Sequence, residues 1–92
     1  MINEKQEEIL KKAINTWGER AQILMVLEEM SELQKEILKY INRGQNNIDG
    51  IIEETADVEI TLEQLKYIFN IHKQVEKCKD VKIEKIKSRL KD

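Results

Sequence analysis

Residues 42–47 read NRGQNN, and this short polar stretch decides the fold because it separates two long amphipathic segments. Gly44 suits the left-handed position that follows a helix C-terminus, and Asn46 or Asn47 suits the N-cap of the next helix. Apolar residues recur at intervals of three and four on both sides of the stretch. Two long helices joined by so short a connection are expected to pack as an antiparallel hairpin.

Two further breaks complete the helical pattern, one at Gly18 and one around residues 70–73. The chain has no Pro and only three Gly, so few other positions interrupt a helix. No alternation of apolar and polar residues with a period of two is sustained, and we predict no strand. The sequence predicts an all-α fold in a single domain over residues 1–92, a protomer resembling a four-helix bundle with a long central hairpin. The expected helices cover residues 3–16, 19–42, 48–69 and 74–91.

Composition excludes several classes of protein. The 16 Lys and Arg residues against 18 Asp and Glu give a net charge of −2, which argues against a general nucleic-acid binder. The single Cys78 and the single His72 exclude an intramolecular disulfide and a zinc site, and neither residue is expected to act in catalysis. No basic leader and no long apolar run is present, so we expect a cytoplasmic protein without a membrane span. A chain of 92 residues buries little surface alone, and self-association is expected.

Two acidic residues of the second long segment stand inside its apolar stripe. On a helical projection with Glu54 at zero, Asp57 lies at about −60°, Val58 at about +40° and Leu65 at about +20°. The charged residues Glu59, Glu63 and Lys66 project to the far side, where a solvated face is expected. If the helix served only to pack in a bundle, charged residues such as Glu54 and Asp57 would not be expected in its apolar stripe.

The first long segment places Glu29 and Glu32 beside its own apolar stripe. Residues 29–32 and 54–57 are nearly equidistant from the loop, so the hairpin brings the four carboxylates to one level. Removing an ionised carboxylate from water costs free energy, so its negative charge needs a positively charged partner. Either nearby cations supply the compensation, or a hard divalent cation does. Such an all-oxygen site fits Mg²⁺ or Mn²⁺. The cations available to the acids are Lys35, Lys39, Lys66 and Arg43.

The residues Glu28-Glu29-Met30-Ser31-Glu32, followed after the loop by Glu54-Thr55-Ala56-Asp57, match an EExxE…ExxD pattern. This pattern resembles the signature of the all-α, MazG-like nucleoside triphosphate pyrophosphohydrolases. The resemblance extends from residues 17–18 into the last helix. It implies a Mg²⁺-dependent enzyme that cleaves nucleoside triphosphates to the monophosphate and pyrophosphate, and that assembles as a homodimer or homotetramer. The chain lacks the second catalytic-type repeat and most inserted loops of longer relatives, which leaves the preferred base and sugar open.

The resemblance also implies roles for individual residues. Four acids match the metal ligands: Glu29, Glu32, Glu54 and Asp57. Glu28 matches the first acid of the motif and is expected behind the metal ligands or beside the attacking water. Gln22 resembles a position that lines the nucleotide pocket. For the reaction itself, Glu29 or Glu32 is the expected general base.

Further substrate contacts follow from the residues themselves, each with a structural alternative. Trp17 is placed either to stack on a base or to anchor the core or an interface. Lys82, Lys85 and Arg89 recur at intervals of three and four and form either a clamp for the outer phosphates or an exposed basic face.

The function has a structural alternative as well. A non-catalytic helical module for oligomerisation or partner binding would use the same acids as pairing charges. In that case Glu28, Glu29 and Glu32 would form an ordinary solvated helix face. A di-iron carboxylate protein is excluded because no acid lies three residues before His72.

Overall fold

The computed structural model describes residues 2–90 and contains four helices and no strand within that range. The helices are α1 (Glu4–Trp17), α2 (Glu19–Arg43), α3 (Ile48–Phe69) and α4 (His72–Arg89). The all-α class is confirmed, and each of the first three helices matches its predicted range to within one residue at either end. The predicted end of the fourth helix, residue 91, lies outside the described residues.

Local sequence explains the ends of α1. The Asn3 side chain accepts a hydrogen bond from the Gln6 backbone N–H at 2.9 Å, and the Gln6 side chain accepts one from the Asn3 N–H at 3.0 Å. This reciprocal pair satisfies two donors that a helix N-terminus leaves free. At the other end Gly18 has a φ of 92°, a value that L side chains rarely adopt, so the chain turns there into α2.

The loop between α2 and α3 forms as predicted at one end and differs at the other. Gly44 adopts the left-handed conformation (φ 62°), and its N–H bonds to the Lys39 carbonyl. Asn47 is the N-cap of α3, but its side chain makes no capping bond. Instead its Nδ2 donates to the Glu36 backbone oxygen at 2.8 Å and to Glu36 Oε1 at 3.0 Å. Asn47 therefore ties the loop back onto α2, and Glu36 has a structural role there.

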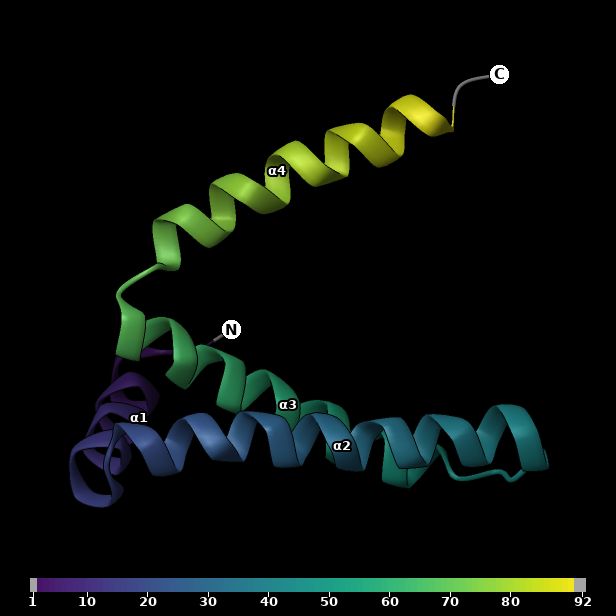
Figure 1. Ribbon diagram of the computed structural model, residues 1–92, viewed down its shortest axis with the longest axis horizontal. Coiled ribbons are helices and arrows are strands. Elements are labelled where there is room, and N and C mark those ends of the chain that lie inside the picture. Colours follow the sequence, from purple (N-terminus) through teal and green to yellow (C-terminus); the bar gives the residue numbers. More distant parts are fainter. Residues whose placement is uncertain (1, 91–92) are drawn as a thin grey trace.

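The two long helices form the predicted antiparallel hairpin, and α1 crosses it at the end remote from the loop (Figure 1). The core between these three helices is small. Among the described residues only three apolar side chains are buried, and three polar ones are buried with them. They are Ile14, Val26 and Val58, and Gln22, Thr61 and Gln64.

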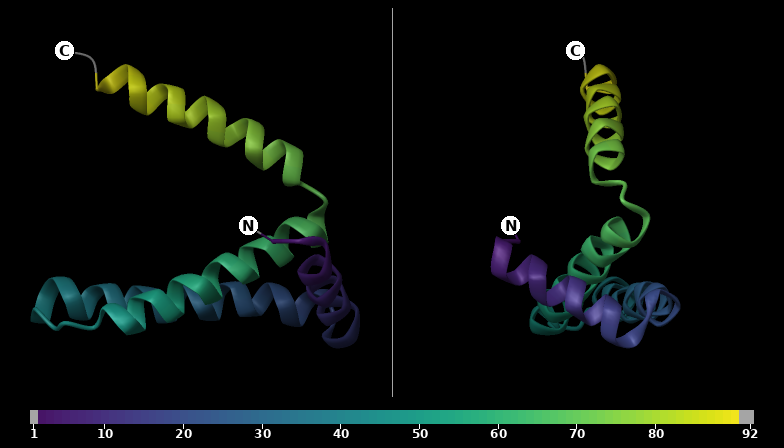
Figure 2. Two further views of the ribbon diagram at one scale, coloured as in Figure 1. Left: turned by 180° about the vertical axis from the view of Figure 1, so that it is seen from behind. Right: turned by 90° about the vertical axis from the view of Figure 1, so that its left-hand side faces the viewer.

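The last helix stands away from the other three. Both views in Figure 2 show α4 standing apart from the hairpin, and none of its residues is buried. The chain turns at Asn70, which has a left-handed φ of 54°, and the Ile71 N–H bonds to the Lys66 carbonyl. The structure thus packs three of its four helices together, and a four-helix bundle is not formed within the described chain. The sequence of this segment has only a narrow apolar stripe, which predicts a helix on the outside, and the arrangement agrees with that prediction. The members of this stripe are Val75, Ile83, Ile86 and Leu90.

Candidate functional site

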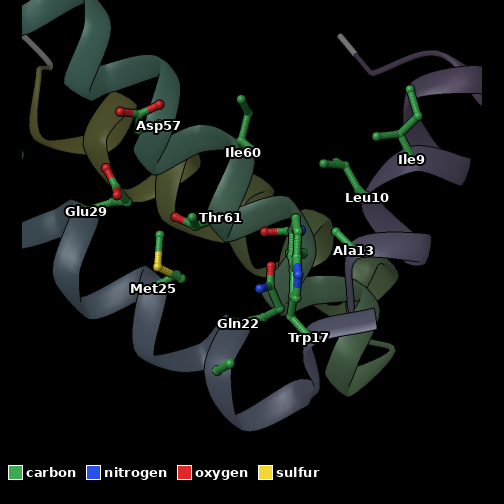
Figure 3. Close-up of a pocket in the computed structure, with 12 residues that line it drawn as sticks. Ile9, Leu10, Ala13, Trp17, Gln22, Met25, Glu29, Asp57, Ile60 and Thr61 are labelled. Carbon is green, nitrogen blue, oxygen red and sulfur yellow. The ribbon is translucent and has the colours of Figure 1, made fainter. Parts of the chain in front are cut away.

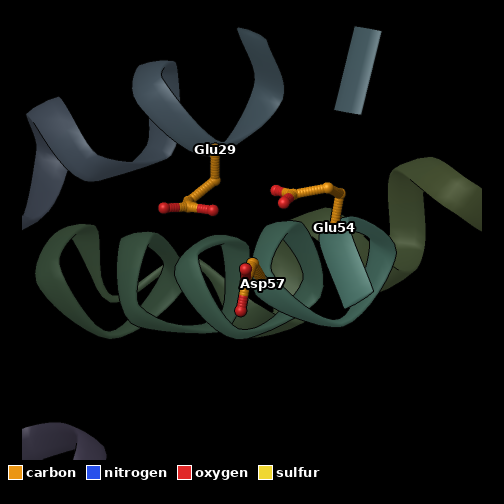
Figure 4. A group of neighbouring side chains, drawn as sticks. All are labelled: Glu29, Glu54 and Asp57. Carbon is orange, nitrogen blue, oxygen red and sulfur yellow. The ribbon is translucent and has the colours of Figure 1, made fainter. Parts of the chain in front are cut away.

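Three carboxylates meet between the facing sides of α2 and α3. Figure 4 shows Glu29 extending from α2 towards Glu54 and Asp57 on α3. One carboxylate oxygen from each residue lies within 4.8 Å of those of the other two, and all three residues are half-buried. Because α2 and α3 run antiparallel, residues equally far from the loop come to the same level. The hairpin therefore brings together these three of the four acids that the sequence suggested as metal ligands.

The fourth acid of that set and the first acid of the motif lie outside the cluster. Glu32 is exposed, and its Oε1 lies 3.8 Å from Lys35 Nζ. Its negative charge still reaches the site, since it contributes to the raised pKa of Glu54. Glu28 is also exposed. The metal-ligand role of Glu32 and the supporting role of Glu28 therefore stay predictions.

The electrostatics of the cluster show that its charges are uncompensated. Burial raises the pKa of Glu29, and the neighbouring charges of Asp57 and Glu54 raise it further. Burial raises the pKa of Glu54 as well, with further contributions led by Asp57 and then Glu32. Glu54 Oε2 is buried, and no hydrogen-bond partner for it is found among the described residues. A buried carboxylate oxygen without a donor is costly unless something else binds it.

Three of the four cations that the sequence offered to these acids pair with acids outside the cluster of Glu29, Glu54 and Asp57. Lys35, Lys39 and Lys66 each pair with the acid three residues before them on their own helix. Within residues 2–90, no ion pair involves Glu29, Glu54 or Asp57. For the three clustered acids, the compensation by basic side chains that the sequence left open is therefore not seen, whereas Glu32 has such a partner in Lys35.

The donor set fits a hard divalent cation. Three carboxylates from two rigid helices, one with an orphaned oxygen, supply the oxygen ligands that Mg²⁺ and Mn²⁺ prefer. Neither His72 nor Cys78 is part of the cluster, so the nitrogen and sulfur ligands typical of zinc are missing from it.

A pocket with a volume of about 720 Å³ opens beside the cluster, between α1, α2 and α3. In Figure 3, Glu29 and Asp57 lie at one end of it, and Gln22 and Trp17 lie at the other. The volume is typical of small-molecule sites, which are mostly apolar with a few polar groups. Most of the wall between the two ends is apolar: Ile9, Leu10, Ala13, Ala21, Met25 and Ile60.

Two buried glutamines form the polar part of the far end. Gln22 was expected at the pocket from the sequence, and Gln64 was missed. The sequence does hold a signal for Gln64 at the pocket, because Gln64 follows Asp57 by seven residues, or about two turns, and so lies on the same side of α3. Gln22 has the same relation to Glu29 on α2, which it precedes by seven residues. Thr61 was missed in the same way. It lines the pocket, and its hydroxyl donates to the Val58 carbonyl at 3.0 Å.

Trp17 lines the pocket while 66% of its surface remains exposed. A side chain so open to solvent does not anchor the core of this chain. It is free to cover a ligand with its ring face, or to contact another subunit.

The basic residues of α4 are not brought to the carboxylates. Lys82, Lys85 and Arg89 are exposed on the part of α4 that diverges from the hairpin. Within this chain they form the exposed basic face that was the alternative to a phosphate clamp. Contact with phosphates at the acid cluster would require α4 to move or to come from another copy.

The sequence predicts a break between helices at residues 70–73, but in the structure His72 is the first residue of α4. Its Nε2 lies 2.9 Å from Glu63 Oε2, and its ring packs against that of Tyr67 with centroids 4.6 Å apart. Glu63 also pairs with Lys66 at 3.0 Å, so this side of α3 is less solvated than predicted. Burial and the Glu63 charge raise the pKa of Tyr67 to about 12. The group joins α4 to α3 and lies outside the pocket, and Cys78 is exposed on α4.

Metal-free protein is expected to become more stable as the pH falls from about 7 to about 5. Glu29 and Glu54 have pKa values raised above 4.5 in the folded state, so the folded state binds protons more tightly than the unfolded chain. Their contribution is therefore present at low pH and is lost as the pH rises through the raised pKa values. Glu36 and Glu63 have lowered pKa values and act in the opposite direction, but only below that range.

Thermal unfolding in the presence of a chelator, followed by circular dichroism at several pH values, measures this effect. The Glu54→Gln variant should show a weaker pH dependence, because one of the two raised groups is gone. A wild-type melting temperature that falls steadily between pH 7 and pH 5 would contradict the assignment.

Comparisons with known proteins leave the resemblance untested. No family model, no curated protein and no solved structure matches the chain. In the described part of the chain, no helix is both long and apolar enough to cross a membrane.

Proposed function

We propose that this protein is a Mg²⁺-dependent nucleoside triphosphate pyrophosphohydrolase. The observation that carries the proposal is the buried, unpartnered Oε2 of Glu54 in a cluster of three carboxylates without cationic partners. The resemblance of the EExxE…ExxD pattern to the MazG-like enzymes points to the same chemistry. Self-association as a homodimer or homotetramer and a cytoplasmic location belong to the same proposal.

Glu29, Glu54 and Asp57 would hold the ion, and Glu32 would join them by rotating its exposed side chain. When bound, Mg²⁺ offsets the negative charge of a triphosphate and makes a water molecule more acidic. The carboxylates keep their positions because they project from two packed helices rather than from loops.

The chain's own acids would also handle the proton of the attacking water. Glu29 borders both the carboxylate cluster and the pocket, and its raised pKa makes its carboxylate a better proton acceptor. Glu32 remains the other possible base, at the exposed edge of the same region. Glu28, which is further from the cluster, would position water rather than accept its proton.

The rest of the pocket would bind the nucleoside. Seven residues separate Gln22 from Glu29, about 10 Å along α2, which leaves room for a base and a sugar between the amide and the acid. The amides of Gln22 and Gln64 offer donors and acceptors to the edge of a base, and Trp17 offers a stacking surface. Lys82, Lys85 and Arg89 would hold the outer phosphates only when α4 is brought to the site.

The proposal predicts that purified protein with Mg²⁺ converts at least one ribo- or deoxyribonucleoside triphosphate to the monophosphate and pyrophosphate. A panel of common and modified nucleotides, analysed by ion-exchange chromatography, measures the products. Because Trp17 is the only tryptophan and lines the pocket, quenching of its fluorescence reports nucleotide binding independently of turnover. Release of orthophosphate, or no turnover with any nucleotide, would contradict the proposal.

A non-catalytic helical interaction module is the second candidate. It is favoured by the large number of exposed apolar side chains, among them Leu27 and Ile41 on α2 and Leu90 after α4. Calorimetric titration with Mg²⁺ or Mn²⁺ separates the two candidates. The module predicts no specific metal binding, whereas the enzyme predicts binding that depends on the carboxylate cluster.

A further inference from the structure

A second apolar stripe runs along the outer side of α2. The four side chains of this outer stripe project at about 120° to 220° from Glu29 around the helix, away from the side of α2 that faces Glu54 and Asp57. At least half of the surface of each is exposed, although they are large aliphatic side chains. In the right-hand view of Figure 2, α2 is seen nearly end-on, with α3 on one side of it. The members of this outer stripe are Leu24, Leu27, Leu38 and Ile41.

The spacing of the outer stripe is that of a coiled-coil seam. Between its two apolar pairs, Ser31 and Gln34 continue the same register, so that successive intervals are three, four, three, four and three. A repeat of 3.5 residues keeps one side of a helix facing a partner helix along its whole length. Ser31 and Gln34 are exposed as well, so the whole seam is open in this chain.

The seam is also self-complementary. If a second α2 lies against it in the antiparallel direction, Leu24 meets Ile41, and Leu27 meets Leu38 of the second copy, in a register that places every apolar residue opposite another. Ser31 then meets Gln34 at the centre, where a polar pair can set the register. Such a match of a surface with itself is what a two-fold symmetric interface requires.

The charges that border the seam fit the same arrangement. Glu28 and Lys35 both lie along one edge of the outer stripe and are exposed. Antiparallel pairing places Glu28 of one copy near Lys35 of the other, twice per dimer. Opposite charges therefore meet at this edge.

The surface of the isolated chain leaves room for a large interface. It exposes 7788 Å², whereas a compact monomer of 10.9 kDa exposes about 5,600 Å². Its radius of gyration is 16.1 Å, against about 12 Å for a compact chain of this length. The excess of about 2,200 Å² per chain amounts to about 4,400 Å² for two chains, which lies within the total area that obligate homodimers bury. Part of this excess belongs to α4, which has no buried residue.

We infer that α2 pairs antiparallel with α2 of a second copy of this chain across the seam formed by Leu24, Leu27, Ser31, Gln34, Leu38 and Ile41. The pairing needs neither metal nor nucleotide, so it is tested independently of the proposed activity. It leaves Glu29 and the pocket on the other sides of α2, where they remain open to a ligand.

The mass of the protein in solution provides the first test. Sedimentation velocity at micromolar concentration should give the mass of a dimer, or of a tetramer built from two dimers, for the wild type. Leu27→Gln with Leu38→Gln should raise the dissociation constant of the α2 pairing at least about 100-fold, because four large apolar side chains per dimer lose their burial. Gln is a good helix former, and circular dichroism checks that helicity is kept.

The matched control makes the same change on α4. Ile83→Gln with Ile86→Gln also replaces two exposed aliphatic side chains. This control should leave the α2 pairing unchanged. A monomeric wild type, or loss of the dimer with the control but not with the α2 variant, would overturn the inference.

Disulfide cross-linking tests the direction and register, and it remains informative if the glutamine variant does not fold. In a Cys78→Ser background, chains with Leu24→Cys are mixed with chains with Ile41→Cys and oxidised. The mixed disulfide should form, while either chain alone should not cross-link, since the two copies of residue 24 lie about 25 Å apart along the antiparallel pair. Efficient cross-linking of Leu24→Cys with itself would indicate parallel helices, and no mixed disulfide from a dimeric protein would indicate another surface. Either result overturns the inference.

Discussion

Glu54→Gln is expected to lower the turnover of nucleoside triphosphates by more than about 100-fold while it raises the melting temperature of the metal-free protein. Turnover falls because the variant removes a charged ligand of the metal ion. Residues that only orient metal ligands already lower metal affinity or activity about 10- to 100-fold when they are replaced, so the loss of a ligand itself should cost more. The melting temperature rises because the substitution removes a half-buried charge that Asp57 and Glu32 repel and no donor satisfies. Asp57→Asn is expected to lower turnover to a similar extent.

The control for this experiment is Glu53→Gln. Glu53 is the neighbour of Glu54 in the sequence, but it is exposed, and its charge contributes less to the raised pKa of Glu54 than burial, Asp57 and Glu32 do, so its loss should change turnover and melting temperature much less. Steady-state kinetics of pyrophosphate release and thermal unfolding with and without chelator measure both effects. Unfolding of both Glu54→Gln and Asp57→Asn would show that the acids act in structural pairs and would contradict the site.

Mg²⁺ is expected to stabilise the folded protein. At a concentration about 100 times its dissociation constant, a ligand of the folded state adds about 2.7 kcal/mol to the free energy of unfolding. For a chain of this size, that corresponds to a rise in melting temperature on the order of 10 °C. The physical reason is that the cation compensates carboxylates that raise one another's pKa values in its absence.

The rise should be much smaller in a variant that carries both Glu29→Gln and Glu54→Gln. The same ionic strength supplied by KCl should also give little rise, because K⁺ screens charge without binding the cluster tightly. Mn²⁺ should replace Mg²⁺. An equal response of wild type and double variant would show that the stabilisation comes from general screening or from another site.

The resemblance and the structure support different parts of the proposed function. The EExxE…ExxD pattern supplies the reaction and the metal, while the structure supplies three meeting carboxylates and a pocket that borders two of them. The pocket also explains how a chain with only three buried apolar side chains among the described residues can offer an apolar site. One of its walls comes from α1, which closes one side of the hairpin.

Much of the fold was predictable because helix boundaries depend on local chemistry. Gly18 and Gly44 end helices through backbone conformations that glycine adopts easily, and the loop length directs the chain back on itself. The position of α4 was not predictable from its narrow apolar stripe. Its direction depends on the left-handed Asn70 and on the His72–Glu63 contact, which involves residues from two helices.

By itself, the sequence determined which residues share a side of each helix, and hence that Glu54 and Asp57 stand among apolar neighbours and can face Glu29. Helical periodicity gives these angles because it depends only on the rotation per residue. The tertiary structure decided that Glu32 lies outside the cluster, that Gln64 borders the pocket, and that the cations of α4 lie apart from the acids. These relations depend on the distances and crossing angles between helices, which side-chain packing determines and no single helix encodes.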